Sequence, residues 1–406
     1  MTSRERVRMA LRHQEADMVP IDFGGMRSTG INAIAYNRLK DYLGIKGETK
    51  VYDIFQQLAK PEPEVLRAMG GDVIQLDRLA PSFGIKNTAW KPSALMDGSP
   101  CLVPEDFNPV TNGKGGLDIC GDDGIPFARR PKGGHYFDLV RHRLAHVESI
   151  EDLDGLQGDE ISDEEQAYLA AEAKHAFDVT DYAILGAFGG NIFEAGQMDF
   201  GYETYFAYLA IEPDIIHAYN RIITDAYMRS LKKYLDAVGR YIDVIQFGDD
   251  LGTQQSSQIS VPMYREMIKP YQMEQYQFVR KNYPEVKVFL HSCGAINSLI
   301  PDLIDAGVEV LNPVQLSARG MDAAKLKAEY GDALTFWGGG VSTQTTLTTG
   351  SIAGIENEVR ENMRIFAPGG GFVFTQIHNI QANIPPEKIM AGYNTAAGCR
   401  RYAKGV

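Results

Sequence analysis

Cysteine is scarce in this chain, and long apolar runs are missing. Four thiols spread over 406 residues (Cys101, Cys120, Cys293 and Cys399) do not form the framework of a disulfide-stabilised secreted domain. No apolar segment reaches the length of a membrane span. The N-terminal residues alternate charged and apolar side chains, which is unlike the apolar stretch of a signal peptide. We therefore expect a cytoplasmic protein with reduced thiols and no membrane partner.

Positive charge is in deficit as well. The formal net charge of −13 argues against a nucleic-acid partner, because affinity for phosphates requires a basic surface. The chain does have abundant apolar residues, 44% of the total, which is enough for a large core. Its length fits two or three average domains or one large α/β barrel.

Short β-rich runs alternate with longer helical patterns along the whole chain. This alternation predicts repeated βα units and therefore a parallel sheet. We count eight expected strands, the number that closes a (β/α)8 TIM barrel, and we predict one such domain over residues 1–406. The expected strands are Val19–Phe23, Asp72–Leu76, Tyr182–Leu185, Ile242–Phe247, Lys287–Leu290, Val308–Leu311, Leu334–Trp337 and Phe372–Thr375.

One stretch interrupts this rhythm between the second and third expected strands. Residues 79–146 are rich in glycine, proline and aspartate, a composition typical of hairpins joined by tight turns. Long insertions in barrels often serve as lids or substrate-binding elements. The sequence predicts either a lid above the barrel mouth or an added β-sheet without a role in function.

Three strand ends carry side chains that bind metals or transfer protons. His291 and Cys293 are two residues apart, so they point to the same side of an extended strand, and imidazole and thiolate are both zinc ligands. A catalytic zinc needs a third protein ligand, for which His378, after the last expected strand, is the candidate. Asp249 and Asp250 follow the preceding strand as a fourth ligand, as an orienting group, or as part of an Asx turn.

Further candidates also follow expected strands. Asp77 ends the second strand as either a site carboxylate or a turn residue, and Arg27 follows the first strand as either a carboxylate-binding group or a solvated side chain. Glycine-rich segments after two other strands bring the backbone close to a ligand or simply form tight turns. These segments add Phe188, Asn191 and Trp337 as candidate substrate-binding residues.

Four segments resemble the uroporphyrinogen decarboxylase superfamily. They are Gly248–Gln254, His291–Gly294, Leu311–Gln315 and His378–Glu387. The resemblance covers nearly the whole chain outside the insertion. It implies a (β/α)8 barrel and one of two chemistries, either cofactor-free decarboxylation of a porphyrinogen or zinc-dependent methyl transfer to or from a corrinoid protein.

The chain departs from the decarboxylases of this superfamily at two places. Their paired-arginine motif after the first strand is replaced by Asp22–Gly30, which contains one arginine, and they lack the His-x-Cys pair. Asp77 does fall where they have their catalytic aspartate. The methyltransferases have the His-x-Cys pair and a distant cysteine as third ligand, near whose position this chain has His378.

The resemblance thus favours a zinc-dependent methyltransferase component, with His291, Cys293 and His378 as ligands. Its implied partners are a small methylated donor, for which a methoxylated one is favoured, and a corrinoid carried by another protein; a homodimer remains open. A decarboxylase acting on a different acid through Asp77 and Arg27 is the alternative. A barrel that binds a corrinoid or tetrapyrrole without converting it is a third class.

Overall fold

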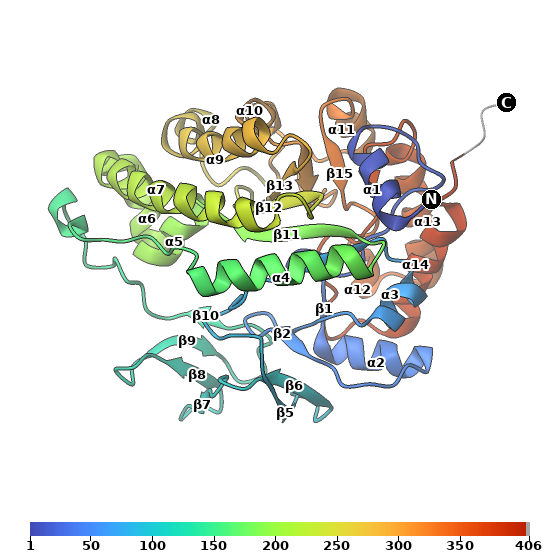
Figure 1. Cartoon of the computed structure of the whole chain (residues 1–406), viewed down its shortest axis with the longest axis horizontal. Coiled ribbons are helices and arrows are strands. Elements are labelled where there is room, and N and C mark those ends of the chain that lie inside the picture. The colour runs from blue at the N-terminus through green and yellow to red at the C-terminus, as the bar shows by residue number, and fades with distance from the viewer. Residues whose placement is uncertain (403–406) are drawn as a thin grey trace.

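The computed structural model describes residues 1–402 and has a curled parallel sheet of seven strands at its centre (Figure 1). The strand order is β16-β15-β14-β13-β12-β11-β4, and helices lie outside the sheet. The fold is therefore α/β and resembles a TIM barrel. The strands are β4 (Val73–Leu76), β11 (Ala183–Gly189), β12 (Val244–Gly248), β13 (Lys287–His291), β14 (Val310–Asn312), β15 (Thr335–Trp337) and β16 (Phe372–Val373).

The first expected strand, Val19–Phe23, is not a regular strand. Its Pro20 has no N–H to donate, and the segment forms only an isolated parallel bridge between Ile21 and Phe374. It still bonds to both edges of the sheet. The amide of Asp22 donates to the carbonyl of Phe374 at 2.8 Å, and the amide of Asp72 donates to the carbonyl of Ile21 at 2.7 Å.

The helices that follow the strands have the amphipathic pattern that the sequence predicts. In α7, buried apolar side chains such as Ile216, Ile223 and Leu231 recur at helical spacing, and Pro213 stands in the first turn, where its missing N–H costs nothing. The longer helices are α1 (Ser3–Leu11), α2 (Ala33–Leu43), α4 (Asp163–Val179), α5 (Phe193–Phe200), α6 (Tyr202–Ile211), α7 (Pro213–Val238), α9 (Lys269–Asn282), α11 (Ala323–Tyr330), α13 (Ile352–Phe366) and α14 (Pro386–Cys399).

The interior of the curled sheet is an apolar core closed at one end by the N-terminal helix. Alternate strand residues point inward, as the two-residue period of a strand requires. They form a separate buried cluster with Val7, Ala10 and Leu11 of α1 (Ser3–Leu11). The strand members of this cluster include Val73, Leu185, Val244, Phe289, Val310, Trp337 and Val373. Helix α1 therefore covers the N-terminal ends of the strands and leaves the opposite ends for function.

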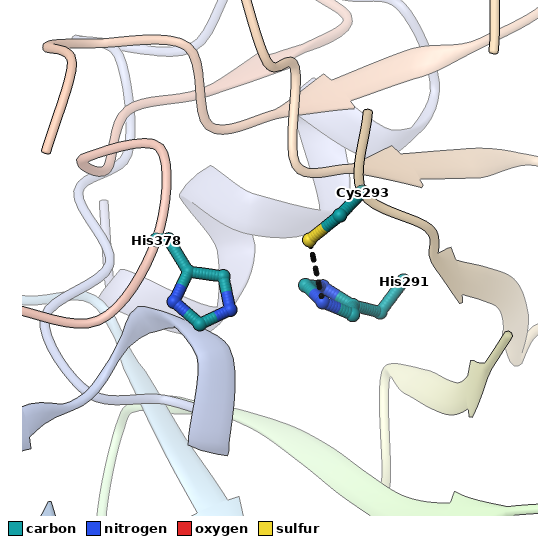
Figure 2. A group of neighbouring side chains, drawn as sticks. All are labelled: His291, Cys293 and His378. Carbon is teal, nitrogen blue, oxygen red and sulfur yellow. Dashed lines mark hydrogen bonds between the residues drawn. The ribbon is translucent and has the colours of Figure 1, made fainter. Parts of the chain in front are cut away.

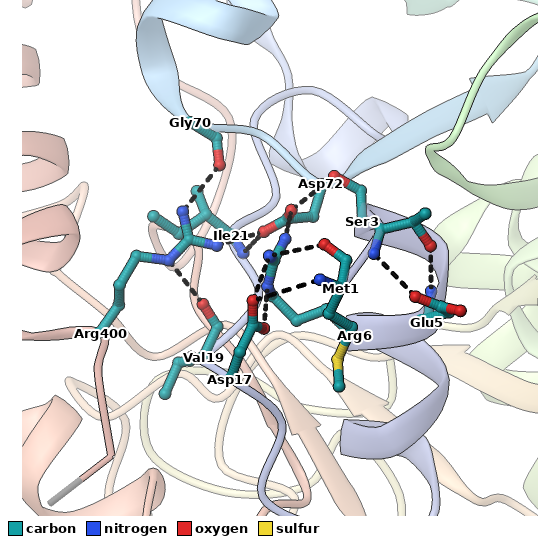
Figure 3. Close-up of polar contacts among 11 residues, drawn as sticks. Met1, Ser3, Glu5, Arg6, Asp17, Val19, Ile21, Gly70, Asp72 and Arg400 are labelled. Atoms are coloured by element: carbon teal, nitrogen blue, oxygen red, sulfur yellow. Dashed lines mark hydrogen bonds and ion pairs between the residues drawn. The ribbon is translucent and has the colours of Figure 1, made fainter.

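A buried ion network fastens both chain ends to this closed end (Figure 3). Asp72, just before β4, accepts from Arg6 of α1 and from Arg400 beyond α14, each at 2.5 Å. Its carboxylate also accepts from the amide of Ile21 at 2.9 Å. Asp17 adds a second partner for Arg6 at 2.8 Å. One carboxylate thus joins the first helix, the segment between the sheet edges and the C-terminal region.

Residues 79–146 contain antiparallel hairpins that lie apart from the parallel sheet (Figure 1, teal). They comprise a two-stranded pair, β5 (Trp90–Ala94) and β6 (Pro100–Pro104), and a four-stranded sheet, β7 (Val110–Thr111), β8 (Leu117–Cys120), β9 (Pro126–Arg130) and β10 (Asp138–Leu139). A third small sheet combines β1 (Ile31–Asn32), β2 (Val51–Asp53) and β3 (Leu58–Ala59). Within residues 1–402, no helix is both long enough and apolar enough to cross a membrane.

The ion network gives a prediction about stability. Asp72→Asn leaves Arg400 charged and mostly buried without its carboxylate and leaves Arg6 with Asp17 alone, so we expect the free energy of unfolding to fall by about 3 kcal/mol. Urea denaturation followed by circular dichroism measures this loss. Glu64→Gln, which removes an exposed pair with Arg67, is the matched control and should leave the midpoint unchanged. Equal midpoints for Asp72→Asn and the wild type would contradict a stabilising role.

Candidate metal centre

Two imidazoles and a thiol converge at the C-terminal ends of the strands (Figure 2). His291 ends β13, Cys293 follows two residues later, and His378 lies in the loop after β16. One ligand atom from each residue lies within 4.8 Å of the other two. The Nε2 atom of His291 is 3.4 Å from the Sγ atom of Cys293. The structure therefore brings together the three residues that the sequence selected as metal ligands.

Hydrogen bonds fix which nitrogen of each histidine faces the centre. The Asn312 amide nitrogen donates to the Trp337 carbonyl at 2.7 Å, so its Oδ1 atom faces the His291 Nδ1 atom 2.6 Å away and accepts from it. In the same way the Asn379 amide nitrogen donates to Gln56, and its Oδ1 accepts from His378 Nδ1 at 2.9 Å. Both protons therefore lie on Nδ1, and both Nε2 lone pairs are available to a metal, although that of His291 accepts from the Cys293 thiol at 3.4 Å.

The loop that carries Cys293 is held by a close backbone crossing. Gly294 has φ +93°, and a Cβ atom there would lie 2.4 Å from the carbonyl carbon of Gly252. A Cβ atom on Gly252 would in turn lie 2.6 Å from the carbonyl oxygen of Cys293. Only glycine fits at both positions. The amide of Cys293 also donates to Asp250 Oδ1 at 2.8 Å, which connects the loops after β12 and β13.

Asp249 and Asp250 point in opposite directions, as adjacent residues at a strand end do. Asp250 lies beside the centre, with Oδ1 3.7 Å from His291 Nε2. Asp249 is fully buried away from it and accepts from the amides of residues 192–194, where α5 begins, each at 2.9 Å. Gln272 of α9 donates to the same carboxylate at 2.7 Å. Burial raises the pKa of Asp249 to about 6, although these hydrogen bonds lower it.

The protonation of the centre suits a metal. Burial, with the nearby His291, lowers the pKa of His378 to about 4, so this imidazole is neutral at pH 7. Burial, with the carboxylate of Asp250, raises the pKa of the Cys293 thiol well above its usual value. The thiol therefore keeps its proton until a cation arrives to balance the thiolate.

Two cavities meet at this group of side chains. The larger one has a volume of about 410 Å³ and is bordered by His291, His378 and Asp250 together with Arg27, Phe188 and Asn191. The smaller one, about 310 Å³, is bordered by Cys293 and His378 and by three glutamines, Gln254, Gln315 and Gln344. The imidazole of His378 borders both cavities, so the candidate metal centre lies in the wall between them.

Of the remaining residues that the sequence predicted for the site, some line the larger cavity and others lie outside it. Arg27, Phe188 and Asn191 line the larger cavity, but the guanidinium of Arg27 pairs with the buried carboxylate of Asp53. Asp77 pairs with Lys60 and borders a separate cavity of about 40 Å³. Trp337 is fully buried in the barrel core, where its indole N–H donates to Asp22 at 2.8 Å. It reaches the centre only through its carbonyl, which orients Asn312.

Glu194 is a cavity residue that the sequence reasoning missed. It is in the first turn of α5, lines the larger cavity and accepts from Asn191 at 2.7 Å. Burial and the charges of Asp250 and Asp249 raise its pKa to about 8. The signal in the sequence was the segment Asn191–Glu194 after the third expected strand, in which only Asn191 was selected.

Comparisons with known proteins agree with this architecture. The sequence model of the uroporphyrinogen decarboxylase (URO-D) family matches residues 140–398. Uroporphyrinogen decarboxylase from Chlorobium limicola is 26% identical over 181 residues, 44% of this chain and 47% of that protein. The enzyme of the same name from Pelodictyon phaeoclathratiforme is 25% identical over 217 residues, 53% of this chain and 55% of its own. The matches thus span about half the length of these curated relatives.

A solved structure is similar over nearly the whole chain. The methyltransferase from Methanosarcina mazei matches with a TM-score of 0.60 and 16% sequence identity, covering 98% of this chain and 99% of the other. At this identity the likeness concerns the fold.

The raised pKa of Glu194 gives a prediction about pH. An ordinary glutamate pKa is 4.5, so as pH rises from there to about 8 the folded protein keeps a proton that the unfolded chain has lost, and the folded state loses stability. Glu194→Gln removes this loss. We expect the variant to gain about 2 kcal/mol over the wild type at roughly pH 9, and little at roughly pH 5.

Thermal unfolding of both proteins at the two pH values measures the effect. Glu164→Gln, at an exposed position on α4, is the control, and its difference from the wild type should not change with pH. If the difference in stability between Glu194→Gln and the wild type is also independent of pH, the pKa of Glu194 is not raised by burial.

Proposed function

The chain belongs to the uroporphyrinogen decarboxylase family, and on this basis we propose that it is a zinc-dependent methyltransferase component. It moves a methyl group between a small methoxylated substrate and a corrinoid carried by a partner protein. The observation that carries the proposal is the convergence of two Nε2 lone pairs and one thiol on the wall of a cavity of about 410 Å³. The cavity lies at the C-terminal ends of the strands of the curled parallel sheet.

The donor set fits zinc. Tetrahedral zinc with bonds of about 2.0 Å to nitrogen and about 2.3 Å to sulfur places such ligand atoms roughly 3.5 Å apart. The His291 Nε2 to Cys293 Sγ distance is 3.4 Å. Two neutral imidazoles and one thiolate are a catalytic type of ligand set, because a fourth position stays open for substrate. A zinc ion held there supplies Lewis acidity at the heteroatom from which the methyl group leaves.

The residues of the chain position this chemistry. Asn312 and Asn379 hold the two imidazoles with Nε2 directed at the centre, and Asp250 holds the loop of Cys293 through its amide. Asp249 acts from a distance, because it fixes the start of α5 and the strand end that carries Asp250. Phe188 and Asn191 contribute to the wall against which the substrate binds.

Decarboxylation of a different acid is the second candidate, supported by the names of the curated relatives. It needs cations that hold substrate carboxylates and an aspartate in the cavity. Arg27 is already paired with Asp53, and Asp77 is paired with Lys60 outside the larger cavity. These pairings favour the methyltransferase.

The insertion at residues 79–146 is proposed to act as the lid of the larger cavity. Its Tyr136 hydroxyl donates to Asn379 Oδ1 at 3.3 Å and accepts from Gln381 at 2.6 Å. Asn379 is the residue that orients His378. A movement of the insertion would therefore displace the Tyr136 hydroxyl group, and through Asn379 it would change the orientation of His378.

The metal content tests the proposed function. We expect about one zinc per wild-type chain, strong loss in Cys293→Ala and His378→Ala, and retention in His378→Cys, because thiolate is an equally good ligand. Plasma mass spectrometry of the purified proteins gives the stoichiometry. Cys399→Ala, which removes an exposed thiol far from the centre in sequence, should bind zinc as the wild type does.

Full zinc in His378→Ala would exclude His378 as a ligand and direct the search to Asp250. Full methyl transfer by a zinc-free protein would overturn the proposed mechanism.

The lid proposal predicts a change in substrate affinity. Tyr136→Phe removes the hydroxyl group between Asn379 and Gln381, so we expect the KM for a methoxylated donor to rise about threefold to tenfold, the equivalent of roughly 1 kcal/mol for one hydrogen bond. Steady-state kinetics with zinc-loaded protein measures it. Tyr42→Phe, at an exposed tyrosine, is the control. An unchanged KM would reduce the insertion to a structural appendage.

A further inference from the structure

We propose that the larger cavity selects a methyl donor that carries a positive charge, a small methoxylated amine in which Glu194 binds the ammonium group and the ether oxygen faces the candidate metal centre. This inference deepens the proposed function and rests on it. It assigns Glu194 as the residue that determines specificity for charge.

The cavity holds two carboxylates without a basic side chain to balance them. Glu194 forms no ion pair within residues 1–402, and its carboxyl group accepts only from neutral groups, the side-chain amide of Asn191 and the backbone amide of Asp250. Asp250 lies 3.7 Å from His291 and accepts from the amide of Cys293, whose thiol it also contacts. Partly buried carboxylates without a partner are costly, and a cationic ligand offsets that cost.

The two arginines on the cavity wall cannot serve an anionic ligand without losing existing partners. Arg78 donates through Nε and Nη2 to the two oxygens of Glu165, at 2.5 and 3.0 Å, and through Nη1 to the carbonyl of Phe188 at 3.1 Å. Arg27 pairs with Asp53 and donates to the carbonyl of Pro81 at 3.0 Å. Their charge is already balanced inside the protein, so the groups left to meet a charged ligand are acidic. They are Asp250 and Glu194, and the raised pKa of Glu194, about 8, keeps it mostly protonated at pH 7 until a bound ammonium group favours the carboxylate.

The other walls suit an organic cation. Tyr52, Phe55 and Phe188 line the same cavity, together with the side chains of Met26 and Met198. Aromatic faces attract ammonium groups, and the attraction grows where water is excluded. Aromatic and thioether surfaces also pack against the carbon skeleton of a methoxylated ligand.

A bound zinc ion does not use up both carboxylates. Two neutral imidazoles and one thiolate leave one net positive charge on the ion. The Oδ1 atom of Asp250 lies 3.7 Å from the Nε2 atom of His291 that faces the centre, so this carboxylate is on the metal side and balances this charge. Glu194 then remains for the substrate.

Three ligands of one skeleton and different charge test the inference. They are 2-(4-methoxyphenyl)ethylamine, 2-(4-methoxyphenyl)ethanol and 4-methoxyphenylacetate, which are cationic, neutral and anionic at pH 7. Isothermal titration calorimetry on the full chain, with and without zinc, measures each Kd in the absence of any corrinoid. We expect the amine to bind at least about tenfold more tightly than the alcohol, and the acetate more weakly than both.

Glu194→Gln should lower the affinity for the amine to that for the alcohol and leave the affinity for the alcohol unchanged. Glu164→Gln, at an exposed position on α4, controls for the loss of one negative charge from the protein. The order of the three ligands in the wild type is a test that depends on no variant. Binding of none of them, or binding of the alcohol or the acetate as tightly as the amine, overturns the inference.

The outcome is separable from that of the proposed function. A chain that binds zinc but does not prefer the amine keeps its methyltransferase role and loses the proposed substrate class. A chain that prefers the amine but binds no zinc has a cation-binding cavity and loses the methyltransferase role.

Discussion

One buried carboxylate, that of Asp249, holds the candidate site together. Asp249 directly follows the strand β12, and its carboxylate accepts four hydrogen bonds, three from backbone amides where α5 begins and one from Gln272 of α9. A negative charge at the start of a helix is favourable because the free amides and the helix dipole both point toward it. The carboxylate is desolvated, and these donors replace the water that it has lost.

The hydrogen bonds of Asp249 position two other acidic residues, one beside it in the chain and one at the start of α5. In one direction, Asp250 is turned toward the cavity because its neighbour is turned away, and Asp250 then holds the amide of Cys293. In the other direction, Glu194 donates its amide to Asp249 and presents its side chain to the same cavity. Two carboxylates that face the candidate metal centre therefore owe their positions to a third that does not.

One end of the curled sheet contributes mainly to stability, and the opposite end carries the candidate site. At one end, α1 closes the interior, and Asp72 gathers charged groups from both chain ends. At the other end, buried groups with shifted pKa values, such as His378 and Glu194, border open cavities. Such groups lower the free energy of unfolding, and the buried ion pairs at the opposite end of the sheet offset this loss.

The sequence predicted those elements whose structure depends on residues close together in the chain. The two-residue spacing of His291 and Cys293 placed both on one side of a strand end, and the βα rhythm located seven regular strands. The prediction from local pattern failed where contacts with residues far along the chain determine the structure. Val19–Phe23 reads as a strand, yet Pro20 limits it to an isolated bridge. Which of Asp249 and Asp250 faces the cavity depends on α5 and α9, and Glu194 is brought in by a helix, not by a strand end.

The crossing of Gly252 and Gly294 bears on how metal and protein depend on each other. The two backbones pass so closely that neither glycine has room for a Cβ atom, and the amide of Ala295 donates to the carbonyl of Thr253 at 2.7 Å across the same junction. Glycine, hydrogen bonds and packing set the place of the thiol before any ion arrives. In a small zinc domain the ion and the fold form together. Here the backbone crossing sets the ligand positions by itself, so a metal that binds at the candidate centre would find the thiol already in place.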